Sequence, residues 1–167
     1  MATTKKATAK LTKPLVVTHT PKKSPAKKAT IKESAIKYED KSTGQPQLVP
    51  IFQKIKGMLK PYVKGNIKAQ DGTGGMYNLV STKQVEVMGK IRELFFASAM
   101  VQKGFVGFYF FPIYTDPEIG KELQPELLKC LKGKSCFHIK KDDEQLMEQI
   151  QQALEAGYKL YSSKGWI

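Results

Sequence analysis

Cysteine, histidine and long hydrophobic runs are scarce in this 167-residue chain, and each scarcity excludes a class of protein. The two cysteines, Cys130 and Cys136, stand six residues apart, which matches no zinc spacing, and the only histidines are His19 and His138. We therefore expect no structural metal site, no cofactor, and two reduced, inert thiols rather than a disulfide. The hydrophobic runs are far too short to cross a bilayer and no secretory leader is recognisable, which predicts a cytoplasmic protein without membrane contact.

Acidic residues are also few, and the resulting positive charge is concentrated at one end of the chain. The chain has 28 Lys and Arg against 15 Asp and Glu, a formal net charge of +13. Residues 1–44 hold 11 lysines, no arginine and three acids, and they contain no aromatic residue before Tyr38. Such a segment cannot bury enough apolar surface to fold. We predict a disordered basic tail over residues 1–44 and one globular domain over residues 45–167.

Two short segments of this tail point to a partner. Residues 20–23 (TPKK) and 24–28 (SPAKK) resemble the Ser/Thr-Pro-Lys-Lys elements of linker-histone tails. Proline keeps such a chain extended, so that neighbouring lysines can follow a phosphate backbone and release counterions. This interpretation predicts sequence-independent nucleic-acid contact, and hence association with a nucleoid, through Lys22, Lys23, Lys27 and Lys28. The alternative is a tail that is merely solvated or meets another acidic partner.

Hydrophobic periodicity predicts an α+β domain. Residues 49–62 have a helical pattern with Pro50 in the first turn, Pro61 near the end, and Gly57 marking close packing. Strand patterns follow at residues 66–69, 76–80, 84–88, 91–101 and 105–113, with a loop at 71–75 and a hairpin turn at 102–104. Residues 105–113 are apolar at almost every position, which predicts a central strand covered on both faces.

The last third of the chain predicts two helices, a strand and a third helix. Asp116 is expected to cap the first helix and residues 124–131 to form the second, which Gly133 ends. Residues 135–139 form the strand. Asp142 is then expected to cap the last helix with Gln145 as its capping-box partner. The predicted order is helix, β-meander, helix, strand, helix, in a single domain whose helices pack on an antiparallel sheet.

The helix of the closing segment has a clear apolar face and a clear end. Gly165 is placed to end it in the left-handed conformation, and Trp166 to pack back on the last turn. The residues expected on its buried face are Leu146, Ile150, Ala153 or Leu154, Gly157 and Tyr161.

From about residue 48 to residue 167 the chain resembles the YdhG-like domain family, whose function is unknown. The residues that carry the resemblance are Leu48-Val49-Pro50, residues 59–62 (LKPY), Phe95-Phe96, residues 110–112 (FFP), 133–137 (GKSCF), 156–158 (AGY) and 165–167 (GWI). The resemblance implies helices packed on an antiparallel sheet and no general catalytic set. Some relatives carry an iron-chaperone label, which would require clustered carboxylates. The densest acidic cluster here is Asp142, Asp143 and Glu144, which helix capping also explains.

One small patch is left without a structural explanation. His138 lies in a strand between the Lys132-Gly133-Lys134 turn and Lys140-Lys141, with Cys136 beside it. We take His138, Lys134 and Lys140 as candidate ligand-binding residues for a small anion. The Gly72–Gly75 loop lacks the Lys-Ser/Thr ending of a phosphate loop, and the aromatic run after Phe105 contains no basic residue, so that core packing explains it better than a nucleic-acid stacking platform.

These observations favour a small binding domain over an enzyme. No catalytic residues and no metal ligands are assigned. The alternatives are an iron-binding protein that uses the 142–144 cluster and an enzyme with a site around His138. The sequence leaves the oligomeric state open.

Overall fold

The computed structural model describes residues 39–72, 74–87 and 89–167, all of which belong to the unit Ile36–Ile167. The predicted tail therefore lies outside the described residues except for positions 39–44. In chain order the elements are η1 (Pro46–Leu48), α1 (Val49–Leu59), η2 (Lys60–Tyr62), β1 (Ile67–Asp71), β2 (Met76–Val87), β3 (Lys90–Gln102), β4 (Phe105–Phe110), α2 (Pro112–Thr115), η3 (Pro117–Lys121), α3 (Pro125–Lys129), β5 (Leu131–Lys132), β6 (Cys136–Ile139) and α4 (Glu144–Ser163).

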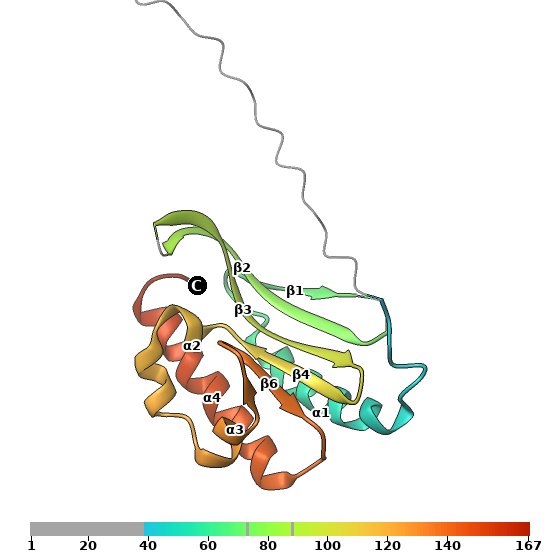
Figure 1. The fold of residues 1–167 in the computed structure, drawn as a ribbon. Coiled ribbons are helices and arrows are strands. Elements are labelled where there is room, and N and C mark those ends of the chain that lie inside the picture. The colour runs from blue at the N-terminus through green and yellow to red at the C-terminus, as the bar shows by residue number, and fades with distance from the viewer. Residues whose placement is uncertain (1–38, 73, 88) are drawn as a thin grey trace, which may run out of the picture. The chain divides into compact units, whose positions relative to one another are not determined.

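The predicted α+β fold is confirmed. Six strands form one antiparallel sheet in the order β1-β2-β3-β4-β6-β5. The first four strands are a meander, whereas β6 pairs with β4 after the chain has formed α2, η3, α3 and β5. Figure 1 shows α1 and α4 on the same side of this sheet. None of the helices in the described part of the chain has the length and hydrophobicity needed to cross a bilayer.

An aromatic cluster joins the two long helices to the sheet. Phe96 of β3 lies 5.9 Å from Tyr62, 6.4 Å from Tyr158 and 5.6 Å from Tyr161, measured between ring centroids. Tyr62 of η2, which directly follows α1, in turn contacts Tyr158 of α4 at 5.5 Å. Each such pair contributes about 0.5–1.5 kcal/mol beyond the area that it buries. The cluster therefore ties α1 and α4 to the same stretch of β3.

A β-bulge allows Phe96 to reach this cluster. Leu79 of β2 pairs with Ala97, whereas the next residue, Val80, pairs with Phe95, so that Phe96 is the extra residue. The bulge shifts the alternation of side chains by one position. As a result Leu94, the bulge residue Phe96 and the next residue, Ala97, are all fully buried.

Gly157 sets how closely α4 approaches the sheet. A Cβ atom at this position would lie 2.6 Å from the Phe110 ring and 2.9 Å from Pro112 Cγ. The Phe110 ring is fully buried and has no room to withdraw. A glycine is therefore required here because the helix backbone touches β4 directly. Gly57 of α1, in contrast, has nothing within 4 Å of its would-be Cβ, so our expectation of close packing there is wrong.

The prediction that β4 is covered on both faces is wrong, although β4 is central, between β3 and β6. Val106, Phe108 and Phe110 are fully buried on the side of the helices. Phe105 and Tyr109 point to the other side and are only half-buried. We call this other side, which carries Phe105, Gly107 and Tyr109 of β4 together with Cys136 and His138 of β6, the open face.

Several predicted boundaries need correction. Residues 76–80 and 84–88 belong to one continuous strand, β2, up to Val87. The central strand ends at Phe110, because Pro112 cannot donate to a ladder and begins α2 instead. Asp116 does act as an N-cap, accepting from the Glu118 amide, but it caps the short 3-10 helix η3. Gly133 does not end α3, which stops at Lys129; it adopts φ +85° in the β5–β6 hairpin.

The cap of the last helix is displaced by one residue from its predicted position. Asp143, not Asp142, is the N-cap of α4, and its carboxylate accepts a hydrogen bond of 2.8 Å from the Leu146 amide. Asp142 instead forms an ion pair of 2.7 Å with Lys54 of α1. The predicted apolar face is confirmed, because Leu146, Ile150, Ala153, Leu154, Gly157 and Tyr161 are all buried.

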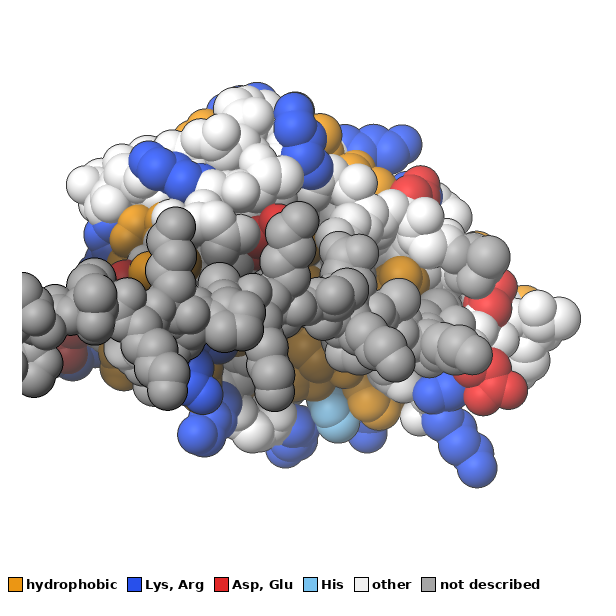
Figure 2. Space-filling view, turned by 90° about the horizontal axis from the view of Figure 1, so that it is seen from above, with side chains coloured by type: hydrophobic (Ala, Val, Ile, Leu, Met, Phe, Trp, Pro, Cys, Tyr) orange, Lys and Arg blue, Asp and Glu red, His pale blue; other side chains and the backbone are white. Residues whose placement is uncertain are grey.

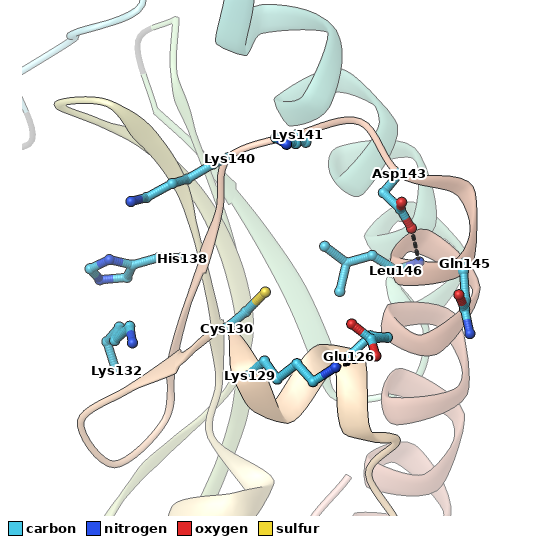
Figure 3. A pocket seen from close by; sticks show the side chains of 10 residues that line it. All are labelled: Glu126, Lys129, Cys130, Lys132, His138, Lys140, Lys141, Asp143, Gln145 and Leu146. Atoms are coloured by element: carbon cyan, nitrogen blue, oxygen red, sulfur yellow. Dashed lines mark hydrogen bonds and ion pairs between the residues drawn. The ribbon is translucent and has the colours of Figure 1, made fainter.

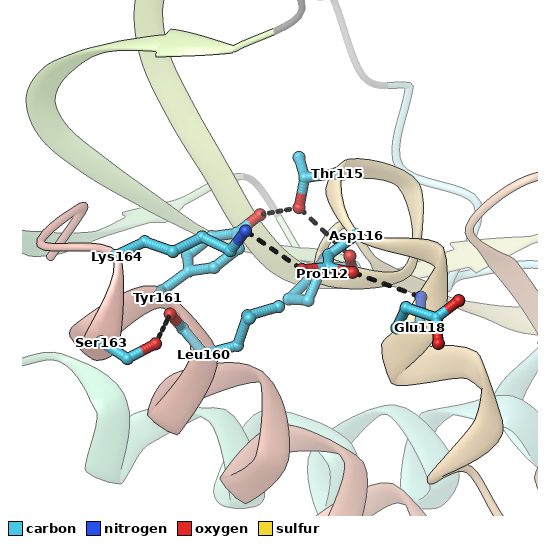
Figure 4. A network of polar contacts seen from close by, with 8 residues as sticks. All are labelled: Pro112, Thr115, Asp116, Glu118, Leu160, Tyr161, Ser163 and Lys164. Atoms are coloured by element: carbon cyan, nitrogen blue, oxygen red, sulfur yellow. Dashed lines mark hydrogen bonds and ion pairs between the residues drawn. The ribbon is translucent and has the colours of Figure 1, made fainter.

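The carboxyl end of α4 is held by a polar network (Figure 4). The Tyr161 hydroxyl lies 3.4 Å from Thr115 Oγ1 and donates to the Phe95 carbonyl at 3.3 Å. Lys164 forms an ion pair of 3.0 Å with Asp116, and this hydrogen-bonded lysine holds the pKa of Asp116 below its ordinary value. Trp166 packs on Tyr161 at 5.3 Å, as predicted. The polar contacts join the end of α4 to α2, β3 and the cap of η3, so the network serves to hold the fold.

The two helical glycines form a matched pair for a stability test. Alanine gains roughly 0.5–1 kcal/mol of helix propensity at either position. At position 157 the overpacking against Phe110 and Pro112 costs about 1–3 kcal/mol. We expect Gly157→Ala to lower the free energy of unfolding by about 1–2 kcal/mol in urea denaturation, and Gly57→Ala to raise it slightly. Equal stabilisation by both changes would contradict direct contact between α4 and β4.

The two aspartates at the start of α4 provide a second matched pair. Loss of an N-cap costs about 1 kcal/mol, with a range of roughly 0.5–2 kcal/mol. An exposed ion pair contributes much less, because both side chains stay solvated. We therefore expect Asp143→Ala to lower the thermal midpoint clearly and Asp142→Ala to change it little. Asp143→Asn should recover most of the loss, since an amide oxygen can also accept from the Leu146 amide. If Asp142→Ala lowered the thermal midpoint more than Asp143→Ala, Asp142 would be the cap, as the sequence predicted.

Candidate functional site

A cavity of about 440 Å³ opens where the β5–β6 hairpin meets α3 and the amino-terminal end of α4 (Figure 3). Its lining includes Cys130, Lys132, His138, Lys140 and Leu146. Figure 3 shows the side chains of Lys132, His138 and Lys140 on one side of the hairpin, with those of α3 and α4 on the other. Two of the three candidate residues from the sequence, His138 and Lys140, are therefore brought to one site.

His138 is fixed by strand geometry and by an aromatic neighbour. Phe137 and Ile139 on either side of it are fully buried, and alternation turns His138 to the open face. Its imidazole is stacked on the ring of Phe105, with 3.6 Å between centroids and 12° between planes. Its backbone amide donates to the Cys130 carbonyl at 2.8 Å. The ring orientation is therefore set before any ligand arrives.

The electrostatic environment favours the neutral imidazole. Burial lowers the pKa of His138 below its ordinary value, and the charges of Lys140 and Lys132 lower it further. No carboxylate in the described part of the chain raises it. A neutral imidazole at pH 7 has one N–H donor and one acceptor nitrogen, so it can donate to an anion without adding charge.

The acids that line the cavity already have partners. Glu126 forms an ion pair of 2.5 Å with Lys129, one turn along α3. Asp143 caps α4. Within the described residues, no ion pair involves Lys132, Lys140 or Lys141. The cavity therefore carries three lysine charges that no described acid neutralises by direct contact.

The two thiols are free and show no sign of activation. Burial raises the pKa of Cys130, and nearby Glu126 raises it further. Burial likewise raises the pKa of Cys136, against a smaller lowering by a hydrogen bond with Tyr109. At pH 7 both are protonated, and a protonated thiol is a poor nucleophile.

The remaining sequence candidates lie elsewhere. Lys134 does not line the cavity, and its ammonium lies 5.2 Å from the centre of the Tyr114 ring. Lys22, Lys23, Lys27 and Lys28 lie outside the described residues. In the 142–144 cluster, Asp142 pairs with Lys54 and Asp143 caps the helix. Over residues 39–72, 74–87 and 89–167, no group of three His, Cys, Asp or Glu side chains is arranged to hold a metal ion.

Phe105 is the functional candidate that sequence reasoning missed, because the whole 105–113 run was assigned to the core. Alternation within β4 was the available signal. Positions 106, 108 and 110 carry Val, Phe and Phe, whereas position 107 is a glycine. A glycine within a strand often marks a close approach by another group, which here is the Tyr109 ring.

Comparisons with protein-family models, with curated proteins and with solved structures found no significant match to this chain.

Titration of His138 tests the electrostatics of the site. We expect proton NMR to give His138 a pKa below 6.5, the ordinary histidine value, in a chain carrying His19→Gln so that only one imidazole titrates. Adding Lys132→Gln and Lys140→Gln should raise this pKa, but not fully to 6.5, because burial is the larger cause. Since folding favours the neutral ring, protonation as the pH falls through this value should also destabilise the protein. A pKa above 6.5 would indicate a carboxylate partner and contradict this arrangement.

Proposed function

We propose that the protein is a binding protein for phosphate-bearing ligands, which it holds at the cavity beside His138. The observation that carries the proposal is the neutral imidazole of His138 between Lys132 and Lys140, with all three side chains on the same side of the hairpin (Figure 3). Ammonium groups and an imidazole N–H suit phosphate oxygens, and hydrogen bonds from charged donors are about twice as strong as neutral ones. The net charge of +13 adds a long-range attraction for anions.

Binding explains this set of residues better than catalysis. A hydrolytic or transfer site needs a nucleophile and a base within hydrogen-bond reach, and often a third group that orients the base. Here His138 is stacked on a phenyl ring and flanked by lysines, and the thiols are protonated. These groups can attract and orient an anion, but they offer no activated nucleophile.

The basic tail extends this proposal to polymeric anions. Its 11 lysines and lack of arginine favour salt-sensitive contact with a phosphate backbone and little base readout. The domain would hold phosphate groups at a defined place, while Lys22, Lys23, Lys27 and Lys28 raise the local concentration of the polymer. A cytoplasmic location belongs to the same proposal and agrees with the free state of Cys130 and Cys136.

The resemblance to YdhG-like domains also becomes a proposal at this point. Support comes from the fold, since the resemblance implies helices packed on an antiparallel sheet. The iron-binding alternative gains no such support, because Asp142 and Asp143 are engaged in an ion pair and a cap.

Inorganic tripolyphosphate is a suitable probe for the cavity. We expect it to shift the His138 ring signals saturably in the His19→Gln chain, and to raise the pKa of His138, because a bound anion favours the imidazolium. Lys132→Gln with Lys140→Gln should weaken this binding at least about tenfold, since two charged donors are removed.

A charge-matched control separates a site from general attraction. Lys90 lies next to the tip of the β2–β3 hairpin and Lys159 on α4, and neither lines the cavity. Their double change to glutamine removes the same charge and should weaken tripolyphosphate binding less than about twofold. If both double variants weaken it equally, the protein has no defined phosphate site and the proposal fails.

A further inference from the structure

The open face continues well beyond the cavity, and the charged side chains that β1 and β5 add to it are lysines. Pairing across the sheet brings Lys68 of β1, Asn78 of β2, Ser98 of β3 and Tyr109 of β4 to this face, beside Cys136 and His138 of β6. Lys132 of β5 pairs with Cys136 and lies on the same side. Figure 2 shows a histidine beside hydrophobic side chains, with Lys or Arg side chains to either side of it.

Strands β1, β4, β5 and β6 place no acid on this surface, although Asp and Glu side chains are visible elsewhere in the view of Figure 2. Asp71 of β1 is on the side of the helices, where it forms an ion pair of 2.8 Å with Lys56 of α1. Glu86 and Glu93 belong to the outer part of the β2–β3 hairpin, beyond the stretch of β3 that pairs with β4. At the rim, Lys41 donates to the Gln102 side chain at 3.1 Å, while Asp40 accepts from Ser42. The face is therefore complementary to an anionic partner.

Aromatic rings on the open face are arranged to receive planar groups. Gly107 leaves room for Tyr109, whose ring carbons lie 2.8 and 3.3 Å from the position that a Cβ at 107 would take. The tyrosine ring therefore lies down over the glycine instead of standing upright from the strand. Hydrogen bonds with Cys136 and Gln102 hold its hydroxyl. The Phe105–His138 stack stands beside it, because His138 pairs with Gly107.

We propose that the open face binds single-stranded nucleic acid, with bases stacked against Tyr109 and the Phe105–His138 pair and with phosphates at Lys132 and Lys140. This inference rests on the proposed function and names the ligand class of the same site. Stacking on aromatic rings and tracking of the backbone by lysines are the two components of sequence-tolerant single-strand binding. In the RNA-recognition motif, aromatic side chains on the open face of a four-stranded sheet accommodate two or three bases in this way.

A second copy of the protein fits this face less well. Two copies packed face to face would bring Lys68, Lys132 and Lys140 of both chains into one interface, where like charges repel. Charge therefore favours nucleic acid.

The aromatic part of the proposal can be tested by fluorescence anisotropy of a labelled 12-nucleotide oligothymidine with the full chain. We expect Phe105→Leu combined with His138→Ala to weaken binding about 5- to 50-fold, while the slope of log K against log salt stays unchanged. Tyr158→Leu is the matched control, because it removes an aromatic ring from the helical side of the sheet. The Lys64 ammonium lies 4.3 Å from the centre of that ring. This control should leave the affinity within about twofold, provided that circular dichroism shows a folded protein. Equally weakened binding in both variants would overturn the proposal.

Unlike the aromatic residues, the lysines are expected to set the salt dependence of oligonucleotide binding. Each phosphate of a single strand that a lysine neutralises adds about 0.7 to the slope. Lys132→Gln with Lys140→Gln should therefore reduce it by about 1.4, and Lys90→Gln with Lys159→Gln should not. Changing Lys22, Lys23, Lys27 and Lys28 of the tail to glutamine should reduce the slope further. In this tail variant, the Phe105→Leu and His138→Ala changes should still weaken binding by the same factor. An affinity that depends on the tail alone would overturn the stacking surface.

The two proposals fail in different ways. If tripolyphosphate binds beside His138 but the oligonucleotide binds no better than a duplex of the same length, the cavity holds phosphate and the stacking surface is wrong. If tripolyphosphate does not bind there, the proposed function itself is wrong. Sedimentation that reveals a dimer disrupted by Phe105→Leu would show the open face to be a self-association surface, which also overturns the inference.

Discussion

The contact between α4 and β4 at Gly157 is the constraint on which the rest of the molecule depends. Because the helix backbone rests on Phe110 and Pro112, α4 lies close enough for Tyr158 and Tyr161 to reach the Phe96 ring. Phe96 is available there only because of the bulge in β3. Closing one side of the sheet in this way uses the apolar surface of both long helices, so the opposite side keeps its half-buried rings.

The strand β4 contributes side chains to both the hydrophobic core and the open face. Its even positions supply the core, and its odd positions supply Phe105, Gly107 and Tyr109 to the open face. The same alternation in β6 buries Phe137 and Ile139 and turns His138 outward, where it meets Phe105 from the neighbouring strand. Core and candidate site are therefore alternate positions of the same two strands. A substitution that shifted the register of either strand would damage stability and binding together.

Local patterns were sufficient to predict the elements but not their partners. Periodicity, proline positions and turn glycines predicted α1, the meander, β6 and α4, and the antiparallel α+β architecture followed from their order. The cap of α4 was placed at Asp142 because two adjacent aspartates are equivalent in sequence; the structure separates them, since Lys54 from α1 engages one and the Leu146 amide the other. Of the candidate site, His138 and Lys140 were predicted, whereas Phe105 was missed because it comes from a different hairpin.

The sequence by itself determined the charge of the protein, its scarcity of metal ligands and its secondary structure, because these depend on composition and on neighbours a few residues apart. The tertiary structure decided which face of the sheet the helices cover. An apolar run such as residues 105–111 has hydrophobic side chains on both faces, and Gly107 is the only local difference between them. The packing of α1 and of α4, the latter more than thirty positions later in the chain, buries one set of side chains and leaves the other beside the lysines of the β5–β6 hairpin.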